Sequence, residues 1–327
     1  MVFKINNQGD YEITKQNFFI MKTQIKLILL SGILTFLACE KEEDLMTGTA
    51  SSLNEEIITT EPDTSQKEKK MISARSVSVT TEADLRAAVS SANPGDVITI
   101  NGTIYLTRTL ELARSGTSSS KINITGGVLN CANQPSGSWG VKVNGSYWNI
   151  TNMTIRNAPD CGIVFQHGGH NYVYNVTTSY NGDSGLQIYN GGHDNYVRQC
   201  YSNDNYDSQN GGENADGYAC KLSAGRNNVF ENCTAHHNSD DGWDLYGQPY
   251  TVTIRNCTAS NNGYGSNGDG NGFKLGSAGQ SVPHTVTGNT AKDNMAWGYD
   301  GNGNTGHITI TGSGGSGNGK GLFTRIY

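Results

Sequence analysis

The stretch N-C-T-A-H-H-N-S-D-D-G-W-D-L, Asn232–Leu245, contains both halves of a repeat that organises most of this chain. In its second half a glycine is followed by an apolar residue, a variable residue and an apolar or small residue. This pattern recurs at Gly162, Gly185, Gly217, Gly242, Gly272, Gly298 and Gly321, in steps of 23, 32, 25, 30, 26 and 23 residues. Such a period is typical of a solenoid, in which each coil buries its apolar face only against neighbouring coils.

The first half of the repeat is an independent anchor. Runs similar to N-C-T-A-H-H-N recur, and each closes on an asparagine: Asn181, Asn205, Asn238, Asn262 and Asn294. From the second residue of the run to the next glycine there are 9 residues in three coils, but 17 and 15 in the other two. Loops of 8 and 6 extra residues therefore enter at the same place in the coil, at 203–213 and 263–268.

These anchors predict an all-β fold, a right-handed parallel β-helix over residues 79–327. Residues one and three after each glycine should point inward and the residue two after it outward, because side chains alternate along a strand. The closing asparagines should form a side-chain ladder at turns with left-handed backbone. Composition agrees, since the chain has 42 Gly and only 6 Pro in 327 residues.

The segment Thr81–Ala92 differs from the coils. Ala83, Leu85, Ala88 and Val89 follow helical spacing, and Thr81 with Asp84 resembles a capping box. We expect a short N-terminal helix that covers the open end of the coil stack, which would otherwise present an unpaired strand edge.

The N-terminal region resembles a bacterial lipoprotein signal. Residues 21–38 combine a basic start with an apolar run and are followed by Cys39, the expected lipidation site, although Phe36 stands where Leu is usual. Residues 1–20 are interpreted as an upstream mis-start, and residues 39–78, rich in Ser, Thr, Glu and Lys, as a disordered tether. We expect a secreted or cell-surface lipoprotein, at the outer membrane, that contacts the membrane only through its lipid anchor.

The net charge bears on the class of binding partner, and the cysteine positions bear on disulfide formation. The net charge is −6 and no basic patch is interleaved with aromatic residues, so nothing indicates nucleic-acid binding. Six cysteines follow Cys39, and three of them, Cys200, Cys233 and Cys257, fall in one column of successive coils. A buried ladder of free thiols is favoured over disulfides.

Aligning the coils on their glycines brings acidic residues together. Asp216 and Asp241 each precede the glycine, Asp240 adjoins them, and Asp244 and Lys274 each lie two residues after it. With neighbouring coils roughly 4.8 Å apart, four carboxylates and a lysine should share one outward face. Carboxylate oxygens without a nearby His or Cys suit Ca²⁺ rather than zinc or copper.

The motifs N-A-D-G-Y-A-C-K-L, N-S-D-D-G-W-D-L-Y and G-D-G-N-G-F-K-L-G resemble those of the polysaccharide lyase family 9 pectate lyases. The resemblance implies a catalytic Ca²⁺ held by Asp216, Asp240, Asp241 and Asp244, with Lys274 as the base. The implied reaction is β-elimination on pectate or a related uronic-acid polysaccharide, faster at alkaline pH because the lysine must be neutral. Lys221 and Asn271 are further candidates for substrate binding, and we expect a monomer.

Three alternatives remain. The first is a rhamnogalacturonan lyase of the same family, since the sequence does not decide between the two polymers or between endo and exo cleavage. The second is an inverting polygalacturonase, disfavoured because G-N-G-F-K-L contains no histidine and His236 and His237 lie elsewhere in the coil. The third is a non-catalytic glycan-binding β-helix that would keep a structural Ca²⁺ but have no use for Lys274.

Overall fold

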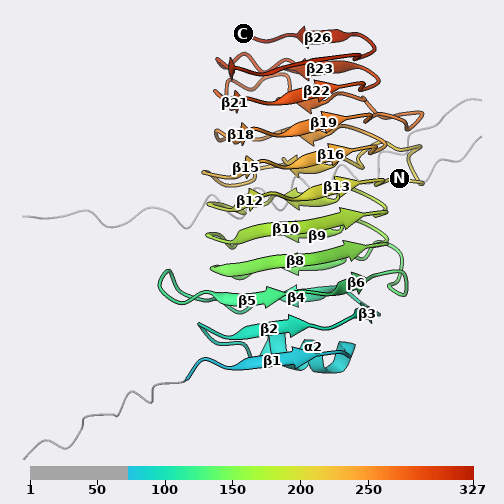
Figure 1. Ribbon diagram of the computed structural model, residues 1–327. Helices are drawn as coiled ribbons and strands as arrows, with labels where there is room; N and C mark the ends of the chain where they lie inside the picture. The colour runs from blue at the N-terminus through green and yellow to red at the C-terminus, as the bar shows by residue number, and fades with distance from the viewer. Residues whose placement is uncertain (1–72) are drawn as a thin grey trace, which may run out of the picture. The chain divides into compact units, whose positions relative to one another are not determined.

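The computed structural model describes residues 73–327, which form a parallel β-helix with one short helix at its N-terminal end (Figure 1). The coils stack along one axis from α2, Glu82–Ser90, to β26, Gly321–Thr324. The predicted fold class is confirmed. The predicted mis-start, signal and Cys39, and the tether as far as residue 72, lie outside the described residues.

One sheet carries the strands that follow the repeated glycines. It has nine strands in parallel register. They are β4 (Leu110–Leu112), β7 (Val141–Val143), β9 (Ile163–Phe165), β11 (Leu186–Ile188), β14 (Tyr218–Cys220), β17 (Trp243–Asp244), β20 (Phe273–Lys274), β23 (Trp297–Asp300) and β26.

The other sheet has seventeen strands and forms the remaining walls of the coils. They are β1 (Ser76–Val79), β2 (Val97–Ile100), β3 (Thr103–Tyr105), β5 (Ile122–Thr125), β6 (Val128–Asn130), β8 (Trp148–Arg156), β10 (Tyr172–Ser179), β12 (Tyr196–Arg198), β13 (Tyr201–Asn203), β15 (Val229–Glu231), β16 (Thr234–His236), β18 (Thr253–Arg255), β19 (Thr258–Ser260), β21 (Thr285–Thr287), β22 (Thr290–Lys292), β24 (Thr309–Thr311) and β25 (Gly314–Ser316). Residues with positive φ, such as Asn232 (53°) and Asn256 (53°), separate its paired strands in the later coils.

The glycine alignment gives the observed register in the central coils. Tyr218 pairs with Trp243, and Trp243 with Phe273, so the predicted inward column is one stack of strand residues. Their rings stack with centroids 4.8 and 4.9 Å apart, and the stack continues through Tyr299 at 4.9 Å. The last coil differs from the prediction by one residue, because Gly321 pairs with Trp297 rather than with Gly298.

The predicted asparagine ladder is present and extends by one coil to Asn318. Each side-chain amide donates to the next side-chain oxygen, as in Asn205 to Asn238 at 2.8 Å and Asn238 to Asn262 at 2.9 Å. The prediction that these asparagines adopt left-handed backbone is wrong. The positive φ falls on the residue before each of them, such as His237 (53°) before Asn238. Moving the left-handed turn back one residue leaves the asparagine side chain directed along the stack.

The three stacked cysteines are buried, and all six described cysteines are free, as predicted. Helix α2 begins where predicted, since the Thr81 hydroxyl accepts a hydrogen bond from the Asp84 amide at 3.2 Å. The buried face of this helix consists of Leu85, Ala88 and Val89.

Two details at this end differ from the sequence interpretation. Ala83 is exposed, and β1 begins at Ser76, three residues inside the predicted tether. Within residues 73–327, no helix combines the length and the apolar character that a membrane crossing requires.

Candidate active site

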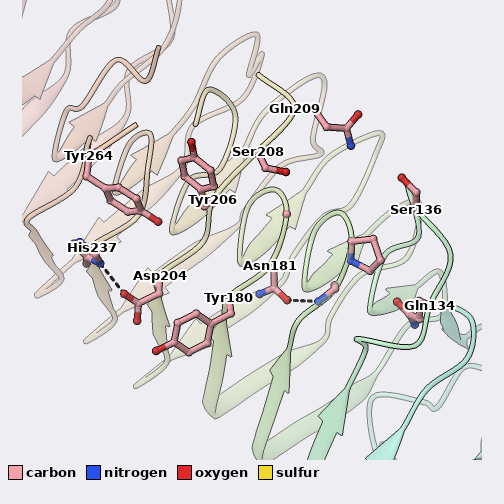
Figure 2. A pocket seen from close by; sticks show the side chains of 13 residues that line it. Gln134, Ser136, Tyr180, Asn181, Asp204, Tyr206, Ser208, Gln209, His237 and Tyr264 are labelled. Carbon is pink, nitrogen blue, oxygen red and sulfur yellow. Dashed lines mark hydrogen bonds and ion pairs between the residues drawn. The ribbon is translucent and has the colours of Figure 1, made fainter. Parts of the chain in front are cut away.

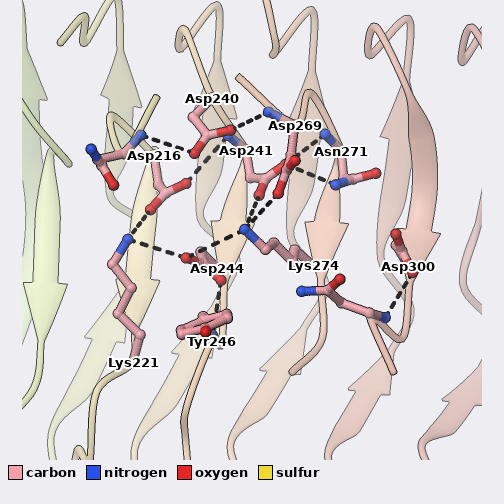
Figure 3. A network of polar contacts seen from close by, with 12 residues as sticks. Asp216, Lys221, Asp240, Asp241, Asp244, Tyr246, Asp269, Asn271, Lys274 and Asp300 are labelled. Carbon is pink, nitrogen blue, oxygen red and sulfur yellow. Dashed lines mark hydrogen bonds and ion pairs between the residues drawn. The ribbon is translucent and has the colours of Figure 1, made fainter. Parts of the chain in front are cut away.

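Three neighbouring strands of the nine-stranded sheet position the predicted residues. Asp216 precedes β14, Asp240 and Asp241 precede β17, and Asp244 ends β17. Asp244 pairs directly with Lys274 on β20. Figure 3 shows these side chains converging on one another from the three coils. The stacked rings of Tyr218, Trp243 and Phe273 belong to the same three strands and point into the core, so they support the strands that carry the charged groups.

The carboxylates are deeply buried. Asp216 and Asp241 are 0% exposed, and Asp240 and Asp244 are 3% exposed. One oxygen each from Asp216, Asp240 and Asp241 lie within 4.8 Å of one another. Although these side chains point away from the core, neighbouring side chains and loops cover them. The outward face predicted for them is therefore a recessed site rather than an open surface.

Backbone and side-chain donors hold each carboxylate in place. Asp241 Oδ1 accepts from the backbone amide of Asn271 at 2.6 Å and from its side-chain amide at 3.0 Å. Asp240 accepts from the amides of Asp269 at 2.6 Å and Asn214 at 3.1 Å. These bonds tie the carboxylates to turns of neighbouring coils, so their geometry follows from the coil stacking.

Two lysines enter the cluster from opposite sides. Lys221 Nζ lies 2.9 Å from Asp216 Oδ2 and 3.1 Å from Asp244 Oδ2. Lys274 Nζ lies 3.5 Å from Asp241 Oδ2 and 3.9 Å from Asp244 Oδ2. Asp244 is therefore shared between the two ammonium groups (Figure 3).

The protonation behaviour follows from burial and mutual repulsion. Burial raises the pKa of Asp216 and Asp241 well above the usual range of a carboxyl, and neighbouring carboxylates raise them further. Burial alone would lower the pKa of Lys274, but the carboxylates of Asp241, Asp244 and Asp216 outweigh it and raise that pKa. The same balance raises the pKa of Lys221. The two lysines thus compensate only part of the carboxylate charge.

The donor set fits a divalent cation. Asp241 Oδ2 is buried and no described donor hydrogen-bonds to it, although Lys274 Nζ lies 3.5 Å away. Several convergent carboxylate oxygens without a histidine or thiol among them are the ligands that Ca²⁺ prefers. A buried, unsatisfied carboxylate oxygen otherwise carries a large desolvation cost.

The two inserted loops meet above this cluster. Gly265 donates to the carbonyl of Ser239 at 2.9 Å, and Asn267 donates to the carbonyl of Gly211 at 3.1 Å. Ser239 Oγ in turn donates to Gly212 at 2.7 Å. The loops come from the coils on either side of the coil that holds Asp240 and Asp241, so they cover its short turn from both sides. The inserted loops predicted at 203–213 and 263–268 therefore lie beside the turn that carries Asp240 and Asp241.

Two contacts of Lys274 were missed by the sequence analysis. Asp269 Oδ2 lies 2.7 Å from Lys274 Nζ, and Lys274 Nζ lies 5.8 Å from the ring centre of Tyr246. Asp269 follows the inserted loop 263–268 and lies three residues before Gly272, whereas the glycine alignment compared the positions one before and two after each glycine. Asn271, predicted to bind substrate, uses its side-chain amide to hold Asp241 and its oxygen to accept from Trp297 N at 3.3 Å.

This chain is similar to known proteins over most of its β-helix. A family model described as "Pel9A-like, right handed beta helix region" matches residues 67–326. Pectate lyase L of Paenibacillus polymyxa (strain SC2) is 36% identical over 269 residues, covering 73% of this chain and 60% of that protein. Pectate lyase L of Dickeya chrysanthemi is 34% identical over 248 residues, covering 68% of this chain and 58% of that protein.

Solved structures share the β-helical fold. The crystal structure of pectate lyase Pel9A superposes with a TM-score of 0.66 at 30% identity, covering 73% of this chain and 69% of that one. A rhamnogalacturonan lyase, with a TM-score of 0.61 at 23% identity over 68% of this chain and 66% of that one, shares the fold. This chain spans about three fifths of the length of these two pectate lyases.

Proposed function

Because this chain belongs to the Pel9A-like right-handed β-helix family, we propose that it is a pectate lyase that cleaves polygalacturonate by β-elimination. One observation carries the proposal. Lys274 on β20 pairs with Asp244 on β17 and lies beside the buried carboxylates of Asp216, Asp240 and Asp241. A non-catalytic cation site has no need of a lysine at this position.

Elimination requires a base at C5 of a uronic-acid residue. Lys274 Nζ would take the C5 proton, the C4–O bond would break, and a C4–C5 double bond would form, with the leaving oxygen protonated from solvent. Only the neutral amine can accept the proton, so rate should rise with pH. Lys221, on the opposite side of Asp244, would bind a second substrate carboxylate once the acidic residues are otherwise neutralised.

Asp216, Asp240, Asp241 and Asp244 would hold Ca²⁺, and their buried oxygens fit it as described above. When bound, the ion would supply positive charge to the substrate carboxylate as negative charge develops there. Asn271 would position Asp241 through its two hydrogen bonds. Asp269 would orient the Lys274 amine through their ion pair, and Tyr246 would orient it through the contact between the amine and the aromatic ring.

The experiment is an absorbance assay of the unsaturated product on polygalacturonate and on rhamnogalacturonan. Wild-type protein should be active with Ca²⁺ and inactive after exhaustive chelation. Adding Ca²⁺ back should restore activity better than adding Mg²⁺, because Mg²⁺ requires a tighter octahedral site. Lys274→Ala and Lys274→Arg should each lower elimination by orders of magnitude, since a guanidinium is rarely neutral. Thermal stabilisation by Ca²⁺ should persist in both variants.

The alternatives separate in the same assay. Activity confined to rhamnogalacturonan would show that the protein is a rhamnogalacturonan lyase. Reducing ends without the unsaturated product would indicate a hydrolase, although no histidine lies in the described cluster and His237 instead pairs with Asp204. Binding without any cleavage, unaffected by Lys274→Ala, would make the chain a glycan-binding β-helix and refute the proposal.

We also propose a lipid anchor at Cys39, with the protein exported to the cell surface or secreted. The proposal is supported by the basic and apolar run at 21–38 that precedes this cysteine. Cys39→Ser should move the protein from the membrane fraction to the soluble fraction. Failure of the wild type to incorporate labelled fatty acid would refute it.

A further inference from the structure

A second cavity lies along the turns that follow β10, β13, β16 and β19. It has a volume of about 810 Å³ and shares no residue with the carboxylate cluster. Figure 2 shows its lining, with the rings of Tyr180, Tyr206 and Tyr264 on one side and Ser208 and Gln209 on another. The first inserted loop contributes Tyr206, Ser208 and Gln209 here, whereas the far end of that loop leads into Asp216.

The aromatic lining is exposed and ordered into a stack. Tyr206 and Tyr264 lie with ring centres 5.7 Å apart and planes 14° apart, and Tyr264 stacks on His237 at 4.3 Å and 13°. Tyr180, Tyr206 and Tyr264 are 60%, 40% and 41% exposed. These tyrosines therefore lie along several coils, and each remains at least 40% exposed although His237 stacks on Tyr264.

Tyr180 is a costly residue at its position. It has φ 56°, and the equivalent residues of the following coils are Asp204 (55°), His237 (53°), Asn261 (55°) and Asp293 (55°). Asn, Asp and His tolerate left-handed backbone, but a bulky tyrosine there is strained. Because its side chain is 60% exposed, packing does not offset the strain. Backbone strain that packing does not offset supports a functional role for this residue.

The polar lining indicates an uncharged ligand. Gln134, Ser136, Ser208 and Gln209 present amides and hydroxyls, and no Lys or Arg lines the cavity. Apart from the tyrosines, its ionisable groups are Asp204 and His237, whose side chains contact each other at 2.6 Å. A uronic acid would find no ammonium or guanidinium group in this lining, whereas Lys221 and Lys274 are present at the carboxylate cluster.

We propose that this cavity binds a neutral oligosaccharide at a site separate from the uronic-acid site. Sugar rings present flat C–H faces that pack on aromatic rings, and their hydroxyls hydrogen-bond to amides and hydroxyls, which is the lining observed. The proposal goes beyond the lyase activity and does not depend on it, because the two sites have no residue in common.

Calorimetric titration with neutral tetrasaccharides tests the proposal on the intact protein. The probes are the β-1,4-linked tetramers of galactose, xylose and glucose, with tetragalacturonate as the charged comparison. At least one neutral probe should bind wild-type protein, with Tyr180→Asn and Tyr264→Ala weakening it at least tenfold. Tyr105→Asn, at a tyrosine that is 54% exposed on β3, is the matched control and should bind as wild type does.

The melting temperature of Tyr180→Asn separates binding from structure. Asparagine suits the left-handed backbone, so this variant should melt at the same temperature as wild type or higher while losing the probe. Unchanged binding in Tyr180→Asn or Tyr264→Ala overturns the proposal, as does binding of no neutral probe. Displacement of the neutral probe by tetragalacturonate also overturns it, because the two ligands would then share a site.

Discussion

Replacing Asp241 by asparagine should stabilise the cation-free protein while abolishing its response to Ca²⁺. Asp241 is fully buried and its Oδ2 atom accepts no hydrogen bond, so the ionised side chain is poorly compensated without a metal. The amide retains an oxygen for the two Asn271 donors and removes the buried charge, while its NH₂ group takes the place of Oδ2, 3.5 Å from Lys274 Nζ. The same substitution removes one anionic ligand from the proposed metal site.

The expected magnitude follows from the surroundings of Asp241. An uncompensated buried charge costs about 3–5 kcal/mol, but Lys274 Nζ at 3.5 Å and the Asn271 donors reduce this. A gain of about 2 kcal/mol in the free energy of unfolding is therefore reasonable. For a domain of this size that corresponds to a rise of roughly 4–8 °C in the melting temperature.

The assay is differential scanning calorimetry of wild type and Asp241→Asn, in chelator and in excess Ca²⁺. Asp269→Asn is the matched control, because its carboxylate contacts the same lysine but is 58% exposed, and it should change the melting temperature little in chelator. A lower melting temperature of Asp241→Asn in chelator would refute the reasoning about buried charge. A full Ca²⁺ response in this variant would refute the assignment of Asp241 as a ligand.

Two further predictions concern the coil stack. Asn238→Ala should lower the free energy of unfolding by about 2–4 kcal/mol in urea titrations, because it breaks the ladder bonds to Asn205 and Asn262 in a fully buried position, whereas exposed Asn133→Ala should have little effect. Burial lowers the pKa of His284 from 6.5 to about 4, so between these pH values the imidazole is protonated in the unfolded chain but neutral in the native one. The free energy of unfolding therefore falls as the pH drops from 6.5 toward 4. Wild type should therefore lose ~3 kcal/mol more than His284→Asn between these pH values in acid-dependent urea titrations, and parallel pH profiles would contradict the shift.

The repeat arithmetic predicted those parts of the site that lie on strands. Asp216, Asp241, Asp244 and Lys274 have fixed offsets from glycines, and parallel strand pairing converts equal offsets into neighbouring positions. The same reasoning failed by one residue at Gly321, which pairs with Trp297 although its G-L-F-T run has the repeated pattern, so the pattern alone does not determine the register of the last coil. A one-residue error of this kind reverses the face to which side chains point.

The repeat spacing does not predict the structure of the inserted loops. Asp269, which contacts Lys274, directly follows the second inserted loop, so the position of its side chain depends on how that loop is held against the neighbouring coil. The tyrosine cavity was missed for the same reason, since Tyr206 and Tyr264 come from those loops. Tyr180 could have been noticed as the aromatic member of a column of Asp, His and Asn, had that column been recognised as left-handed.

The bonding of the two inserted loops over the short turn between them has a consequence for how this protein could change. The loops are held to Ser239 and Gly211–Gly212 rather than to the core, while the coil register is fixed by glycines, rings and asparagines below. The residues that fix the coil stack are thus separate from the residues of the two loops. Grafting loops of another length between Asn205 and Asp216, and between Asn262 and Asn271, should therefore exchange specificity without refolding the scaffold.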